Sequence, residues 1–231
     1  VESGRWPAGS VQLICGGIGD LFDHLNCQDT IAFTGSKTTA EMLQQHPRVV
    51  SESVAFTAET DSLNMSILGP DATPGTPEFD LYIQEVVREM TSKAGQKCTA
   101  IRRIIAPAKV AGDVVAALSS ALGEIRIGNP GSKEVDMGAL ASQDQRAEVR
   151  DRVTEFSKQA DVVYGGSDDF DLVDADARKG AFFMPTLLLC EKPLSSTAVH
   201  SVEAFGPVST VLPYDSIDEA IELAQIGRAH V

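Results

Sequence analysis

Apolar residues fall into two patterns along the chain, short continuous runs and longer stretches with helical spacing. The most regular helical stretch covers residues 78–93, where apolar side chains recur every three or four positions. Gly95 follows it, and a glycine here is typical of a helix end. Weaker spacing predicts helices at residues 20–25, 36–45, 110–121, 143–160 and 216–225, the second of them beginning at Ser36, a good N-cap residue.

The short apolar runs are bounded by glycine, proline or polar residues, which is typical of strands. They lie at residues 11–14, 30–33, 49–56, 63–68, 102–106, 162–164, 186–190 and 208–212. A turn-rich loop is expected at residues 70–77, and an acidic, solvated loop at residues 167–176. Strands that alternate with helices predict a parallel α/β architecture.

Composition and charge narrow the classes of function. The 231 residues are 43% hydrophobic and 23% charged, as in ordinary globular proteins. A net charge of −14 argues against nucleic acid or an anionic membrane surface as partner, because like charges repel. No apolar run approaches the roughly 20 residues of a membrane span. Because the net charge is negative, any phosphate site must be built locally, from backbone N–H groups.

Four cysteines occur, at positions 15, 27, 98 and 190, and none forms a CxxC pair. The four histidines show no ligand spacing, so we expect no metal site. This pattern favours reduced thiols and a cytoplasmic location. Cys98 differs from the other three in position, because it follows a long helix in a glycine-bearing loop, where a side chain can face a cleft. It is either a nucleophile, which would need a base, or an inert thiol.

Two further motifs, FTGS and GGIG, could bind an anionic cofactor or could be plain turns, and a third, EAFGP, could be structural. In FTGS, at residues 33–36, a strand ends in glycine and a helix begins at Ser36, so N–H groups and the helix dipole could hold a pyrophosphate. Residues 16–19, GGIG, resemble half of a dinucleotide fingerprint but lack its third glycine. In EAFGP, at residues 203–207, Phe205 could belong to the core and Gly-Pro to a turn.

Four motifs, in this order, resemble those of the aldehyde dehydrogenase superfamily: FTGS at 33–36, GQKC at 95–98, PTLL at 185–188 and EAFGPV at 203–208. The resemblance implies part of a Rossmann-type cofactor domain with a parallel sheet, followed by part of an α/β catalytic domain. It implies that Cys98 is the nucleophile and that Glu203 contacts the nicotinamide ribose. The residues that it places at the cofactor are Phe33, Thr34, Gly35, Ser36, Glu203 and Phe205.

One branch of the family is especially similar: the dehydrogenase domain of the bifunctional ring-opening proteins of bacterial phenylacetate degradation. The similarity lies in FTAETDSLN at 56–64, EVVREMTSKAGQKCTAIRRII at 85–105 and MGAL at 137–140. It implies oxidation of a CoA-linked semialdehyde with NADP (or NAD), a homo-oligomer and a hydratase domain fused to the full-length protein. Most of the family has ELGGK at the general base; here Glu59 keeps that position without the glycine pair, and Glu52 is a weaker alternative.

The resemblance also sets the expected domain boundaries. Residues 1–59 correspond to the C-terminal part of a cofactor domain and residues 60–225 to an incomplete catalytic domain. Residues 226–231, IGRAHV, match the translation of a common sequencing adapter, so we expect them to be non-native. The family's second oxyanion donor and its adenosine-ribose lysine would lie upstream, so we expect little activity from these 231 residues alone. Another semialdehyde dehydrogenase, or a non-catalytic protein of this fold, remains the alternative.

Overall fold

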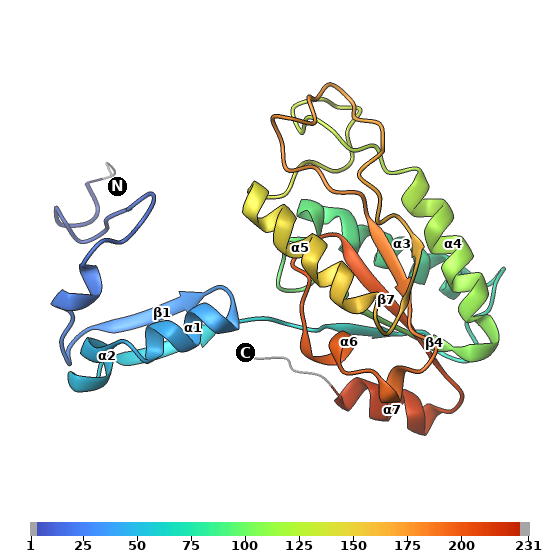
Figure 1. The fold of residues 1–231 in the computed structure, drawn as a ribbon, viewed down its shortest axis with the longest axis horizontal. Helices are drawn as coiled ribbons and strands as arrows, with labels where there is room; N and C mark the ends of the chain where they lie inside the picture. The colour runs from blue at the N-terminus through green and yellow to red at the C-terminus, as the bar shows by residue number, and fades with distance from the viewer. Residues whose placement is uncertain (1–3, 227–231) are drawn as a thin grey trace. The chain divides into compact units, whose positions relative to one another are not determined.

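The computed structural model describes residues 4–226, so all but Ile226 of the segment expected to be non-native lies outside it. By contacts within the chain, the protein divides into two compact units, one of residues up to Thr60 and one of residues from Asp61 onward. Figure 1 shows a small α/β element in the first and a sheet covered by helices in the second. Each unit is described by itself.

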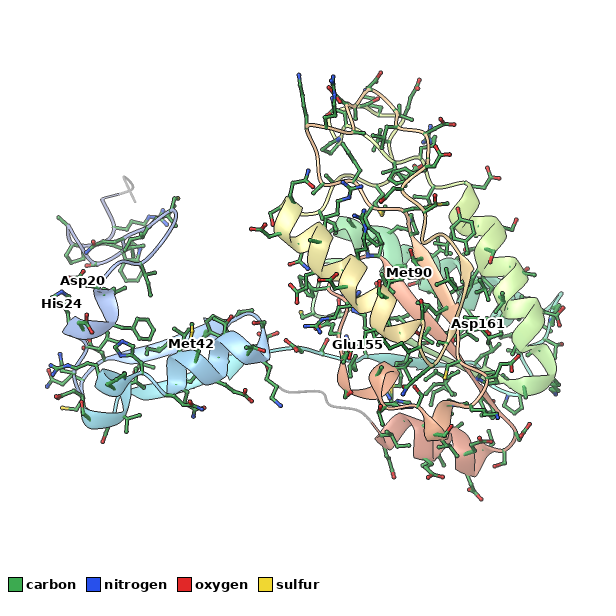
Figure 2. All side chains as sticks on the ribbon, viewed as in Figure 1. Asp20, His24, Met42, Met90, Glu155 and Asp161 are labelled. Atoms are coloured by element: carbon green, nitrogen blue, oxygen red, sulfur yellow. The ribbon has the colours of Figure 1, made fainter. Side chains whose placement is uncertain are left out.

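The first unit is built around two parallel strands, β1 (Thr30–Thr34) and β2 (Ala55–Glu59), in the register Thr34 opposite Glu59. The 3-10 helix η1 (Leu21–His24) precedes them, and α1 (Lys37–Gln44) and α2 (Pro47–Ser51) connect them. The Thr39 N–H donates to the Ser36 hydroxyl oxygen, which caps α1. Met42, on the outer side of α1, is exposed (Figure 2).

The second unit is a five-stranded sheet between two helical layers. Its strand order is β3 (Met65–Ile67), β4 (Arg103–Pro107), β7 (Val208–Tyr214), β6 (Thr186–Leu189) and β5 (Asp161–Tyr164), and only β5 is antiparallel to its neighbour. On β4, Ile104 packs into the core formed with α3 (Pro77–Thr91) and α4 (Ala111–Gly123). Ile105 packs into the opposite core, which includes residues of α5 (Gln143–Phe156), α6 (Ala198–Ser201) and α7 (Ile217–Gln225).

The helix α3 forms where its spacing predicts and then leads directly into the loop of Cys98. Thr76 caps it by accepting from the Phe79 N–H, and Pro77 occupies the first turn, where no N–H is needed. Met90, labelled in Figure 2, lies on its inward face and is fully buried. None of the helices within residues 4–226 has both the length and the apolar character that crossing a membrane requires.

The predicted helices are confirmed, as are all but two of the predicted strands, with shifts of a few residues at their ends. The strand predicted at residues 11–14 is wrong: the segment is irregular and pairs with no strand within the described residues, so its exposed apolar side chains gain no partner. The strand predicted at residues 49–56 is wrong in its first half, because Pro47 starts α2 and buries Val49 on a helix. The 3-10 helices η3 (Ala108–Val110) and η4 (Pro193–Ser195) and the short α6 were not predicted.

Two leucines on neighbouring helices provide a test of the layered core. Leu118 on α4 is fully buried, whereas Leu81 on α3 is 59% exposed. We expect Leu118→Ala to lower the free energy of unfolding by about 2–5 kcal/mol, because a cavity remains where the side chain packed. Leu81→Ala should change it by no more than about 0.5 kcal/mol. Urea denaturation followed by circular dichroism measures both, and equal losses would contradict the packing described.

Candidate active site

The predicted site residues fall into two groups, one in each unit. In the first unit, Thr34 ends β1 and lies beside Glu59, which ends β2, and the Gly35 N–H donates to the Glu59 carbonyl oxygen over 3.1 Å. The structure thus brings the predicted base next to the predicted cofactor turn. Both are exposed, and the N-terminus of α1 begins at Ser36 beside them.

The FTGS turn has the features that a pyrophosphate site requires. Strand β1 ends at an exposed glycine, where backbone can approach a ligand closely, and the positive end of the α1 dipole follows. A Cβ built on Gly35 would lie 2.5 Å from the Phe33 ring carbon Cζ, so the ring position requires a glycine. The residues present therefore fit a dinucleotide phosphate.

In the second unit, Cys98 lies on a loop that starts with unusual backbone geometry. Lys93 and Ala94 at the end of the 3-10 helix η2 (Ser92–Gly95) both have φ of 53°, and Gly95 has φ of 68°. The left-handed region is unfavourable for residues with a Cβ and is typical of functional loops. At Gly95 a Cβ would lie 2.3 Å from the Gly206 carbonyl oxygen, so only glycine fits.

Two side chains hold the peptide carbonyl of Cys98. The Ser62 hydroxyl donates to this oxygen over 2.6 Å, and the Asn64 amide nitrogen Nδ2 donates to it over 2.5 Å. Asn64 Nδ2 also lies 3.2 Å from the Ala100 carbonyl oxygen. The Cys98 side chain is on an exposed residue, so the sulfur is accessible while its backbone is fixed. The Lys97 ammonium, 2.7 Å from a carboxylate oxygen of Glu89 on α3, ties the same loop to the helix.

Behind the loop, the guanidinium of Arg102 donates to three acceptors on two separate segments. Its Nη2 donates to the Gly95 carbonyl oxygen over 2.8 Å and its Nη1 to the Gly206 carbonyl oxygen over 2.6 Å. Its Nε donates to the Glu203 oxygen Oε1 over 3.0 Å. The Phe205 ring centroid lies 5.6 Å from the guanidinium carbon, a cation–π distance. Arg102 therefore joins the Cys98 loop to the EAFGP segment.

The carboxylate of Glu203 is buried and already has partners on both oxygens. Oε1 accepts from Arg102, and Oε2 accepts from the Ser62 N–H over 3.0 Å. Only 5% of each side chain of this ion pair is exposed. Burial raises the pKa of Glu203, although Arg102 and the Ser62 N–H oppose the shift, and burial lowers the pKa of Arg102, although Glu203 opposes it. Desolvation thus outweighs the attraction on both partners.

The four cysteines differ in their surroundings. Cys190, the residue directly after β6, is buried, and burial raises the pKa of its thiol, so it is suited to packing. Cys15 and Cys27 are exposed in the first unit, outside its helices and strands. The GGIG turn at residues 16–19 is also exposed there and leads into a 3-10 helix of four residues, not the helix of a dinucleotide fingerprint.

Sequence reasoning missed Ser62, Asn64 and Arg102. One signal was present for Arg102, because two adjacent arginines interrupt the apolar run at residues 101–106, and charges in a buried strand need partners. Its neighbour Arg103 is likewise buried, and it donates to the Leu63 carbonyl oxygen. Ser62 and Asn64 gave no such signal.

Comparison with known proteins adds independent findings. Residues 1–226 match the model of the aldehyde dehydrogenase family. The chain is 49% identical over 228 residues to a 3,4-dehydroadipyl-CoA semialdehyde dehydrogenase of Aromatoleum evansii, a match that covers 99% of this chain and 44% of the relative. Among solved structures, a Bacillus cereus aldehyde dehydrogenase in complex with NAD+ superimposes with a TM-score of 0.73 at 28% identity, covering 86% of this chain and 38% of that one.

A Staphylococcus aureus betaine aldehyde dehydrogenase in complex with NAD+ gives a TM-score of 0.75 at 27% identity, again covering 86% of this chain and 37% of that one. These likenesses agree with the predicted fold class, an α/β fold of the aldehyde dehydrogenase type. The chain spans less than half the length of the relatives named here.

Two glycines offer a matched test of the loop geometry. Gly95→Ala should lower the free energy of unfolding by at least about 2 kcal/mol, because it adds a Cβ against the Gly206 carbonyl in a left-handed conformation. Gly112→Ala, on α4 with open space around it, should be neutral or stabilising by up to about 1 kcal/mol. Thermal unfolding of both variants measures this difference, and an unchanged Gly95→Ala protein would mean that the loop approaches residue 206 less closely.

Proposed function

The chain belongs to the aldehyde dehydrogenase family, and from that premise we propose that it carries the nucleophile of an enzyme that oxidises a CoA-linked semialdehyde to its carboxylic acid with NADP or NAD. The observation that carries this proposal is the accessible Cys98 on a loop whose carbonyl is held by Ser62 and Asn64. A free cysteine with a structural role is usually buried as a small apolar side chain, whereas Cys98 is exposed.

The proposed chemistry begins at the sulfur of Cys98. Its thiolate attacks the aldehyde carbon and forms a thiohemiacetal, whose oxygen gains negative charge. Among the described residues, the Cys98 N–H donates to no protein acceptor, so it is available to that oxygen. A nicotinamide bound to this fold would accept hydride, and the carbon held by Cys98 would then reach the oxidation level of a thioester.

Glu59 is the proposed base for the second half of the reaction. An exposed carboxylate takes a proton from water, the water oxygen bonds to the thioester carbon, and the carbon–sulfur bond breaks to release the acid and the Cys98 thiolate. Residues 33–36 are proposed to hold the dinucleotide phosphates, because the glycine turn and helix N-terminus fit that group. Phe205, which is partly exposed, is proposed at the nicotinamide end.

The substrate class comes from similarity. The relative from Aromatoleum evansii is named for a CoA-linked semialdehyde, and at 49% identity over nearly the whole chain it supports the same class here. Residues 1–59 are proposed to belong to the cofactor domain and residues 60–225 to the catalytic domain. A homo-oligomer and a fused hydratase domain are proposed for the full-length protein on the resemblance of residues 56–64, 85–105 and 137–140 to the ring-opening dehydrogenases, and a cytoplasmic location on the absence of CxxC pairs.

The nucleophile is tested by Cys98→Ser in the full-length protein, with Cys27→Ser, another exposed cysteine, as the matched control. We expect kcat for semialdehyde oxidation to fall at least about 10³-fold in Cys98→Ser, because a serine hydroxyl without an adjacent base stays protonated. Cys27→Ser should keep the activity of the unmodified enzyme. The assay follows reduced nicotinamide by absorbance, and full activity without Cys98 would exclude the mechanism.

The role of Glu59 is tested by Glu59→Gln, which keeps size and removes the base. A burst of reduced nicotinamide equal to the number of sites should remain, followed by turnover about 10²-fold slower, because the thioester forms but is hydrolysed slowly. Stopped-flow absorbance separates the two phases. Glu52→Gln is the control that should leave both unchanged; if Glu52→Gln slows turnover instead, the weaker alternative is the base.

A further inference from the structure

The ion pair of Arg102 and Glu203 lies in a position that its stability alone does not explain. Each side chain is only 5% exposed. Burial raises the pKa of Glu203 and lowers the pKa of Arg102, so it favours the neutral form of both. Buried ion pairs of this kind are often no more stabilising than apolar residues of similar size. What an apolar pair would lack is direction: three donors of one rigid guanidinium aimed at three different acceptors.

We propose that Arg102 is a positioning residue for Cys98, and that Glu203 acts by orienting Arg102 and Ser62 rather than only by contacting a cofactor. The kinetic part of this proposal rests on the proposed function; the structural part does not. Arg102 fixes the start of the loop through the Gly95 carbonyl. Cys98 lies three residues after Gly95, and the Ser62 hydroxyl fixes its carbonyl oxygen.

The two attachments share a single anchor, which is the carboxylate of Glu203. One of its oxygens accepts from Arg102 Nε and the other from the Ser62 N–H, and the Ser62 hydroxyl continues to the Cys98 carbonyl. The path from Glu203 therefore reaches the nucleophile loop at both ends. A displacement of this carboxylate would release both attachments together.

The Arg102 contacts also counter the strain at the start of the loop. Lys93 and Ala94 are held in the left-handed region, which is unfavourable for residues with a Cβ and persists only where the surroundings enforce it. Arg102 Nη2 binds the carbonyl of the next residue, Gly95, while its Nη1 holds the Gly206 carbonyl beside the same glycine. Without these bonds the segment is free to relax and move the sulfur.

The structural test measures amide hydrogen exchange in the full-length protein without cofactor. Arg102→Gln keeps a planar amide but loses most of the donors, so we expect exchange across residues 95–100 to become about tenfold faster or more. Arg126→Gln, which removes a half-exposed arginine whose side chain bonds only to Asp136 among the described residues, should leave that segment unchanged. Unchanged exchange in Arg102→Gln would overturn the proposal, whatever reaction the enzyme catalyses.

The kinetic test separates positioning from cofactor binding. We expect kcat to fall about 10²-fold in Arg102→Gln, because a small misplacement of a reacting atom has an effect of this size, while the Kd for the dinucleotide changes less than about twofold. Arg102→Lys restores the charge but reaches only one acceptor at a time, so it should recover thermal stability without recovering kcat. Recovery of kcat in proportion to stability would reduce Arg102 to a structural role and overturn the proposal.

Two further variants keep the test decisive if Arg102→Gln does not fold. Ser62→Ala keeps every Arg102 bond and removes only the hydroxyl donor to the Cys98 carbonyl, so exchange in residues 95–100 should still rise. Glu203→Gln places an amide against one of two donors, and we expect faster exchange in the same segment. A Glu203→Gln protein with a weakened dinucleotide Kd and normal loop exchange would show a cofactor contact alone, against this proposal.

Discussion

One buried guanidinium connects the Cys98 loop of the second unit to the EAFGP segment. Arg102 directly precedes β4, and its donors reach Gly95, seven residues earlier, and the segment of Glu203 and Gly206, about a hundred residues later. The sheet brings these segments near one another because β4 and β7 are neighbours in register. Strand pairing sets the approximate positions, and the guanidinium sets the final geometry.

The loop that carries Cys98 combines a strained entry with a well-bonded body. Left-handed backbone at Lys93 and Ala94 turns the chain sharply after α3, and hydrogen bonds on the carbonyls of Gly95, Cys98 and Ala100 absorb that cost. Because side chains satisfy these carbonyls, the backbone needs no regular secondary structure to stay in place. Cys98 can thus be exposed while its backbone is fixed.

Much of the architecture could be predicted because local signals agreed with the final packing. The periodicity of α3 matches its buried face, and Thr76 and Pro77 mark its start. The strand prediction at residues 11–14 was wrong because an apolar run forms a strand only where another strand pairs with it. The strand prediction at Val49 was wrong because Pro47, two positions earlier, starts a helix. Cys98 and the FTGS turn were identified through family motifs, whereas Ser62, Asn64 and Arg102 act through contacts between distant segments, which no local pattern encodes.

The division of the chain into two units has a consequence for the proposed reaction. Glu59 ends β2 in the first unit, and Cys98 belongs to the second, so the proposed base and the proposed nucleophile are carried by different units of the protein. Substitutions in the first unit can then alter the proposed hydrolysis of the thioester without altering its proposed formation at Cys98. Under the proposed mechanism, a variant without the Glu59 carboxylate would retain the acyl group as a thioester on Cys98, where another thiol could accept it in place of water.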